Sequence, residues 1–280
     1  MNEKRIGALQ VALGATCWSF AGVFCKYLPW SAWTIIGMRS LVCALALRLT
    51  RKSWKVKITR GTLLGAIGVS VTGMLFLLST KLTTAANAIV LQYAVPVFVI
   101  LFCWIAFHQK PTRADVITTI CVLIGVVLCS LSGVLSGGGR LLGDLLAIAS
   151  SVTYTLVFVS ARFPDSSAQD YVYLGALMCA PLSLCAFFDP NMTLQIPHLL
   201  AITAMGACLA IGYYLVSRSL NRVDPITSAL LANLEPVLNP VWTYLFLGEN
   251  PGVLTIIGAC IVIFSVTAYS ILGLRNRKPV

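Results

Sequence analysis

Apolar segments alternate with short polar connections along the whole chain. An α-helix needs about 20 mainly apolar residues to cross the hydrocarbon core of a bilayer, and most segments approach that length. Charged side chains gather in the connections rather than inside the segments. The pattern predicts an all-α integral membrane protein with ten transmembrane helices, at approximately residues 6–27, 31–49, 61–80, 84–106, 113–133, 142–163, 169–188, 198–218, 225–247 and 252–273.

The composition excludes a water-soluble domain. Of 280 residues, 58% are hydrophobic and only 10% are charged, and the mean hydropathy is +0.89. Soluble domains typically hold about 25% charged residues. The first apolar segment has no small-x-small cleavage site and is followed by many equivalent segments, so it is expected to be a membrane helix rather than a removed signal peptide.

The net charge is +11, and the basic residues behind it follow the predicted membrane topology. If the N-terminus is cytoplasmic, 16 of the 20 lysines and arginines fall on the cytoplasmic side, three fall outside, and Arg39 lies within a helix. This excess is the positive-inside pattern of membrane proteins. It predicts a multi-pass protein of the cytoplasmic membrane with both termini in the cytoplasm, and nucleic acid is not an expected partner.

The two halves of the chain repeat each other. Matching residues recur at offsets of 136 to 140, including Gly7 and Gly143, Trp18 and Tyr154, and Pro96 and Pro236. The expected domains are residues 1–135 and 140–280, each with five helices. Because five is odd, the second half would enter the membrane from the opposite face. Such inverted repeats are typical of secondary transporters, whose substrate sites lie near the bilayer midplane.

A carboxylate and two prolines interrupt the predicted helix 225–247. A charged side chain at the bilayer centre costs about 2.5–3.5 kcal/mol on insertion scales, so Glu235 is a candidate functional residue. Pro236 has no N–H and leaves a carbonyl one turn earlier without its helical partner, and Pro96 does the same in the first half. Pro96 and Pro236 are therefore predicted helix breaks beside a substrate site.

Arg39 is predicted to lie at about the depth of Glu235. Three roles stay open for it: binding a substrate carboxylate, pairing with Glu235, or extending towards the membrane interface. Together, the two charges could receive both ends of a zwitterion. Other polar and aromatic side chains complete the substrate-binding candidates, namely Ser228, Asn239 and Trp242, which share a helix face with Glu235, and Gln92, Tyr93, Trp18, Tyr154, Tyr213 and Tyr214. Core packing and interhelical hydrogen bonding compete with a binding role for these residues.

Catalytic and metal-binding motifs are absent from the sequence. The ten cysteines all fall in apolar segments without C-x-x-C spacing and are expected to be packing residues. The two histidines, His108 and His198, lie near segment ends in different halves. Neither a P-loop nor a dinucleotide-binding fingerprint occurs. The sequence therefore predicts no metal, no cofactor and no enzymatic activity.

Three stretches of the chain carry a more specific pattern. They read CWSFAGVFCKYL at 17–28, ALLANLEPVLNPVWTYLFLGENP at 229–251 and IIGACIVIFSV at 256–266. With the arginine in the second helix, they resemble the EamA-type transporters of the drug/metabolite transporter superfamily. One departure is at His108 and Gln109, where the family usually has a glycine–glutamate pair, present here only as Gly248 and Glu249.

The resemblance implies a secondary transporter of a small polar metabolite, most often an exporter of an amino acid or related compound. Uptake of a cationic amine or a nucleoside-like metabolite is the alternative within this class. A channel or a membrane protein without transport activity is the alternative outside it. The expected partners are a small-molecule substrate and the lipid bilayer, while proton coupling and the oligomeric state stay open.

Overall fold

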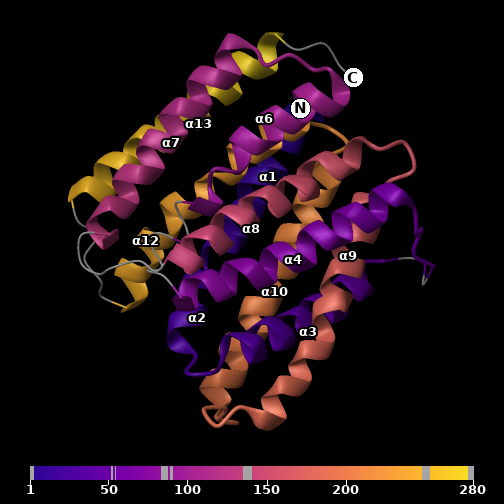
Figure 1. The fold of residues 1–280 in the computed structure, drawn as a ribbon, viewed down its shortest axis with the longest axis vertical. Helices are drawn as coiled ribbons and strands as arrows, with labels where there is room; N and C mark the ends of the chain where they lie inside the picture. Colours follow the sequence, from indigo (N-terminus) through magenta and orange to yellow (C-terminus); the bar gives the residue numbers. More distant parts are fainter. Residues whose placement is uncertain are drawn as a thin grey trace.

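The chain folds into a bundle of helices (Figure 1). This computed structural model describes residues 3–51, 53, 55–82, 88, 91–134, 141–247 and 253–276, and these residues contain no strand. The helices are α1 (Glu3–Ser19), α2 (Ala21–Tyr27), α3 (Ala32–Thr50), α4 (Arg60–Leu82), α6 (Val95–Phe107), α7 (Arg113–Val134), α8 (Leu141–Val159), η1 (Ser160–Arg162), α9 (Ala168–Cys179), η2 (Ala180–Phe188), α10 (Ile196–Ser219), α11 (Pro225–Ala232), α12 (Leu234–Leu247) and α13 (Val253–Asn276).

Six helices of the described part are long and apolar enough to span a membrane. They cover Glu3–Cys25, Ala32–Thr50, Arg60–Ser79, Leu141–Arg162, Ala168–Phe188 and Ile196–Ser219, and the shorter apolar helices Val95–Phe107 and Ile256–Tyr269 accompany them. The all-helical membrane class predicted from the sequence is therefore confirmed, and the count of ten spans stays a prediction.

Helix starts follow from local side-chain chemistry. The Ser31 hydroxyl accepts the N–H of Thr34 at 3.3 Å and caps the start of α3. Ser167 caps α9 in the same way, 136 residues later. Asp224 caps α11, whose first residue, Pro225, has no N–H to leave unsatisfied. The connections therefore end where a capping side chain is available, and two of these caps occupy matching places in the halves.

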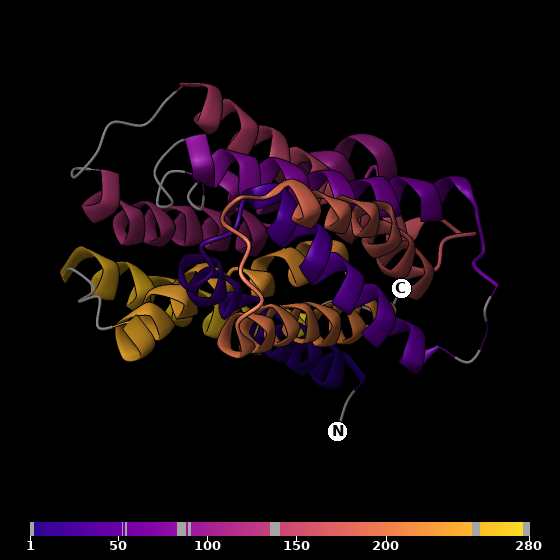
Figure 2. The same cartoon turned by 90° about the horizontal axis from the view of Figure 1, so that it is seen from below.

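The helices pack in a reciprocal way that follows the repeat. Helix α4 packs against α8 and α9, and in the other half α10 packs against α1 and α3. Two further contacts join matching helices to each other: α3 lies against α9 and η2, and α7 lies against α13. Figures 1 and 2 both show α7 and α13 side by side on one flank of the bundle. The two halves are thus related by an approximate two-fold symmetry of packing.

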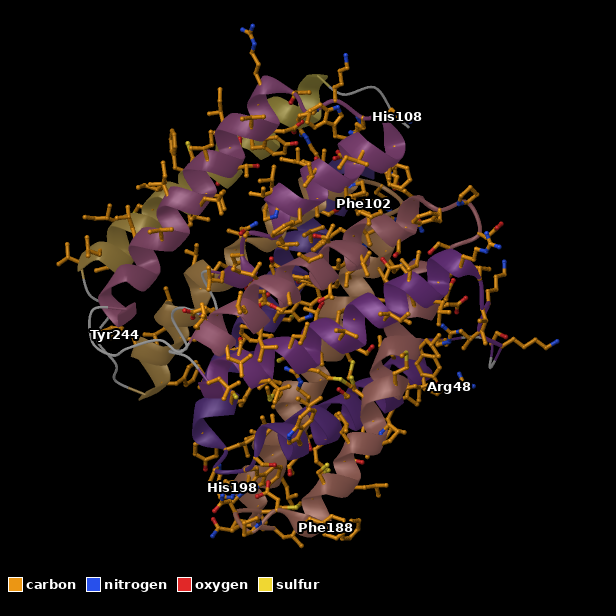
Figure 3. All side chains as sticks on the ribbon, in the orientation of Figure 1. Arg48, Phe102, His108, Phe188, His198 and Tyr244 are labelled. Carbon is orange, nitrogen blue, oxygen red and sulfur yellow. The ribbon has the colours of Figure 1, made fainter. Side chains whose placement is uncertain are left out.

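The two ends of the bundle carry different residues. The start of α1 and the end of α13 lie at the upper end in Figure 1, and Figure 3 places His108 at that end, with Phe188 and His198 at the opposite end. Between them, many large apolar side chains face outwards, such as Leu45 at 61% exposure and Phe264 at 76%. An exposed apolar surface of this kind fits contact with lipid chains.

Candidate functional site

The second half contains a broken helix. Helix α11 ends at Ala232, Asn233 stands outside helical geometry at φ −66° and ψ 2°, and α12 begins at the next residue. The Asn233 amide nitrogen (Nδ2) donates to the carbonyl of Ala229 at 2.7 Å, which satisfies one group freed by the break. Pro236 follows four residues after Ala232, the distance at which its ring excludes the next helical hydrogen bond.

A matching break interrupts the first half. Leu91 and Gln92 are helical, Tyr93 and Ala94 form a turn, and α6 begins at Val95, with Pro96 in its first turn. Tyr93 is the position equivalent to Asn233 at an offset of 140. Both halves are therefore broken at the same register, three residues before a proline.

A cavity lies among the helices near these breaks. Its volume is about 80 Å³, which is room for several waters or a small metabolite. Its lining comes from both halves of the chain and consists of Cys17, Trp18, Ala21, Arg39, Thr72, Gly73, Phe76, Gln92, Tyr154, Met205, Cys208, Leu209, Tyr213 and Glu235. Six of the predicted site residues are among them: Trp18, Arg39, Gln92, Tyr154, Tyr213 and Glu235.

Arg39 contributes a positive charge to this cavity. Its side chain is only 9% exposed, and its Nε has no hydrogen-bond partner. Within the described residues it forms no ion pair with Glu235, although both line the same space. Gly73 of α4 leaves room for the guanidinium, because a Cβ there would come within 3.3 Å of Nη2. The position equivalent to Arg39 in the second half is Gly175, at an offset of 136.

Glu235 is contacted by a residue from the other half of the chain. The Tyr93 hydroxyl, at the break before α6, is hydrogen-bonded to the Glu235 carboxylate, just after the break before α12. Tyr93 is only 3% exposed and lies behind the cavity wall. The two helix breaks therefore meet through this pair.

Aromatic rings form a further part of the wall. The Trp18 ring lies edge-on to Tyr213, with centroids 5.3 Å apart, and 6.3 Å from the Tyr154 ring. The Trp18 indole N–H donates to the carbonyl of Leu209 at 3.4 Å, which fixes α1 against α10. These rings can hold an apolar group or a cation over their faces.

Four further predicted site residues are not part of the cavity wall. Ser228 is fully buried in α11, and its hydroxyl has no hydrogen-bond partner. Asn239 lies against Gly22, where a Cβ would come within 2.3 Å of its Nδ2. The remaining two make other contacts: the Trp242 indole N–H donates to Ser19 Oγ at 2.7 Å, and the Tyr214 hydroxyl accepts from Arg218. The break at Asn233 separates Ser228 from the helix face expected for it, whereas Asn239 and Trp242 follow Glu235 within α12.

Several wall residues carried no signal in the sequence. Thr72 and Gly73 are small residues of α4, typical of helix packing, and Phe76, Met205 and Leu209 are ordinary apolar residues of spans. Cys17 and Cys208 were expected to be packing residues, yet they border the cavity. Asn87, Glu249 and the glycine-rich joint at 137–139 lie outside the described residues.

A lipid-facing bundle with two matched broken helices and a charged central cavity has the architecture of a multi-pass membrane transporter. The chain belongs to the EamA-like transporter family, whose model matches residues 5–131 and again residues 141–271. This family is part of the drug/metabolite transporter superfamily and consists of transporters, not enzymes. The resemblance seen in the sequence is thereby confirmed, including its occurrence in both halves.

Comparison with solved structures supports the fold. One chain, described only as a crystal structure of a protein, superimposes with a TM-score of 0.80 at 18% sequence identity. The match covers 97% of this chain and 99% of that chain. No curated protein sequence matches this chain significantly.

Proposed function

We propose that this protein is a secondary transporter for a small zwitterionic metabolite, an amino acid or related compound, and that it exports this substrate by alternating access. The observation that carries the proposal is the presence of Arg39 and Glu235 on one cavity without an ion pair between them in the described structure. A buried guanidinium without a paired anion is unfavourable. A ligand carboxylate would supply that anion through two parallel hydrogen bonds.

The rest of the cavity suits the other end of such a ligand. The carboxylate of Glu235 would accept hydrogen bonds from an ammonium group, with Tyr93 holding it in place. The rings of Trp18, Tyr154 and Tyr213 would face the remaining part of the substrate. Both charges of a zwitterion would thus be paired with an opposite charge of the protein, whereas a purely cationic amine would leave Arg39 without a ligand group.

The proposed topology has ten spans in two inverted repeats, residues 1–135 and 140–280, with both termini in the cytoplasm of a cell bounded by the cytoplasmic membrane. The reciprocal packing of α4–α8 and α10–α1 supports a two-fold relation between the repeats. The distribution of lysine and arginine supports the orientation. In this arrangement the cavity lies between the repeats, where alternating access requires a site.

Counterflow in liposomes tests the function. Liposomes that contain the purified protein are preloaded in turn with unlabelled amino acids, amines and nucleosides. Those preloaded with the substrate should accumulate its labelled form, and this uptake should saturate. Arg39→Gln should abolish counterflow of a zwitterion, because the carboxylate would lose its charged partner. Uptake that does not saturate would indicate a channel, and an amine substrate that tolerates Arg39→Gln would favour the cationic alternative.

Neighbouring tyrosines give a matched control for the site. Tyr213 lines the cavity and Tyr214 contacts Arg218 instead. Tyr213→Ala should raise the substrate KM by roughly 2- to 12-fold, the range expected for loss of one aromatic packing contact worth about 0.5–1.5 kcal/mol. Tyr214→Ala should leave the KM unchanged. Equal effects of the two substitutions would place the substrate elsewhere.

A further inference from the structure

The helix pair formed by α3 and α9–η2 is tied together at both ends. Residues 31–34 lie beside Asp189, Gly37 lies against the backbone of Ser183, and Arg51 lies beside residues 169 and 170. The two segments are therefore antiparallel neighbours along their whole length. A Cβ at Gly37 would fall 1.9 Å from the Ser183 nitrogen, so only glycine permits this close approach.

One tie consists of the Asp189 carboxylate and the start of α3, and we name it the Asp189 clip. Asp189 follows the last residue of η2, and its Oδ2 accepts from the Ser31 backbone N–H and the Thr34 hydroxyl, both at 2.7 Å. Its Oδ1 accepts from the N–H of Asn191 at 3.0 Å. The end of η2 is thereby fixed to the first turn of α3.

The other tie is an ion pair at the opposite end, and we name it the Arg51 clip. Arg51 follows the last residue of α3, and its Nη2 lies 2.6 Å from Asp170 Oδ1 in the first turn of α9. Both side chains are only 10% exposed. Arg51 Nη1 also donates to the carbonyl of Gln169 at 3.1 Å, and Asp170 Oδ2 accepts from the N–H of Lys57 at 3.2 Å.

The two clips occupy equivalent positions in the repeats. Thr34 corresponds to Asp170 at an offset of 136, and Arg51 corresponds to Asp189 at an offset of 138. The acidic residue differs in position between the clips. In the Asp189 clip it follows the end of η2, and in the Arg51 clip it is Asp170 in the first turn of α9. Figure 3 shows their separation, because Arg48, one turn before Arg51, and Phe188, next to Asp189, lie at different ends of this helix pair.

The clipped helix pair borders the substrate cavity. Arg39 lies on α3 between the two clips and reaches the cavity wall. A smaller neighbouring cavity is lined by Arg39 together with Gly175, Ala176 and Cys179 of α9. Separation of the two segments at either end would therefore open a path beside Arg39, while an intact clip at the other end would keep that side closed.

We infer that the two clips are the gating contacts of the transport cycle, the Asp189 clip closing the cavity towards the outside and the Arg51 clip closing it towards the cytoplasm. The inference rests on the proposed carrier function and the proposed orientation. A carrier must open one side while it holds the other closed. Equivalent contacts at opposite ends of one helix pair allow one side to open while the other stays closed, because each contact can break without the other.

Two native cysteines make the gating measurable without any substrate. Cys17 and Cys208 line the cavity and are partly exposed, so a membrane-impermeant thiol reagent reaches them only through an open side. Labelling is measured peptide by peptide with mass spectrometry in right-side-out and inside-out vesicles. Cys103, which is fully buried in α6 outside this helix pair, serves as the folding control because it should stay unlabelled.

Breaking one clip should shift labelling towards one face. Asp189→Ala should speed labelling of Cys17 and Cys208 from the outside by about tenfold, the size expected for losing hydrogen bonds to a charged group. Asp170→Asn should do the same from the cytoplasmic side. Thr34→Val, which keeps the side-chain shape and removes one hydrogen bond of the Asp189 clip, should have a smaller effect in the outward direction.

Two outcomes would overturn the gating role. Faster labelling from the same face in both variants would show that the clips only stabilise the fold. Unchanged labelling in Thr34→Val and in Arg51→Gln, with Cys103 still protected, would show that neither clip limits access. Counterflow by the unsubstituted protein is measured in parallel, so a failure of the carrier function itself is recognised separately from a failure of the gating assignment.

Discussion

Arg39 and Glu235 come from different repeats, and each was recognisable as a charge inside an apolar segment. Their positions in the predicted helices already put them at about the same depth. The absence of an ion pair between them in the described structure depends on side-chain geometry, which no sequence pattern specifies. Tyr93 likewise stood out only as one aromatic among several, yet its hydrogen bond makes it the partner of Glu235.

Replacing Glu235 by glutamine distinguishes two roles for this residue. The substitution keeps size and hydrogen bonding but removes the charge. If Glu235 holds the substrate ammonium group, Glu235→Gln should abolish substrate binding at every pH, because the charged partner is lost. Equilibrium binding and counterflow, both measured between pH 5.5 and 8, check this outcome.

The same variant would behave differently if Glu235 carried a proton. Binding and counterflow would then persist, and only accumulation driven by a pH gradient would be lost. A variant that binds, exchanges and accumulates substrate like the parent would remove Glu235 from the site and leave it a structural residue.

Among the helices, the broken pair shows both the reach and the limit of sequence reasoning. The prolines indicated where the breaks lie, because a proline ring excludes the hydrogen bond to the residue four positions earlier. Helix α11 ends at that residue, Ala232. The phase of α12 relative to α11 could not be derived in this way, so the sequence could not show whether Ser228 shares a face with Glu235. Asn239 and Trp242 follow Glu235 in α12 at helical spacing, but of the three only Glu235 lines the cavity.

Removing a helix-breaking proline should affect transport more than folding. Pro236→Ala would allow α11 and α12 to approach a continuous helix and would turn Glu235 away from Tyr93. We expect counterflow to fall by about tenfold, the size of an effect near 1.4 kcal/mol. The apparent unfolding temperature should stay equal or rise, since alanine favours helix. Pro96→Ala is the matched variant in the first half, and normal transport by both would mean that the breaks do not shape the site.

The Asp189 clip should respond to acid only at low pH. Partial burial alone would raise the pKa of the Asp189 carboxyl, but hydrogen bonds from Thr34, Ser31 and Asn191 outweigh it and lower the pKa below its ordinary value. A lowered pKa means that the clip stabilises the folded state above the unfolded pKa, about 3.9, and loses this contribution as the pH falls through the folded value.

Labelling of Cys17 from the outside gives the corresponding measurement. Its rate should stay constant as the external pH falls from 7 to about 5 and should rise only below about 4. Asp189→Ala should abolish this dependence. A rise already at pH 6 would implicate a group other than the clip.

For the whole molecule, the alternation of apolar and polar segments was sufficient to predict a helical membrane bundle, and the matched residues predicted its two repeats. The cavity was harder to predict, because most of its wall consists of small or apolar residues such as Gly73 and Leu209. Such residues line a cavity only through the way distant helices meet, and the same residues would pack against lipid or protein elsewhere.

The proposed orientation can be tested with small tags. Tags at both termini and at Lys55 should be reached only from the cytoplasm, and a tag at Asn191 should be reached only from outside. The reason is the odd number of proposed spans between Lys55 and Asn191. Accessibility to an impermeant biotin reagent in intact cells measures this. A tag at Asn191 that is reached only from the cytoplasm would exclude five spans in each half.

Arg39 has a glycine, Gly175, as its counterpart in the second repeat. Arg39 and Gly175 line the same small cavity, and two arginines there would repel each other. The bundle is consequently symmetric in its packing but asymmetric in the charges that its two halves bring to the cavity. A substrate that binds when the cavity faces inwards should therefore meet surroundings that differ from those it meets when the cavity faces outwards. The half-saturation constants on the two sides of the membrane need not be equal. At low substrate levels, transport from the side with the lower constant would then have the higher initial rate. The final equilibrium would not change.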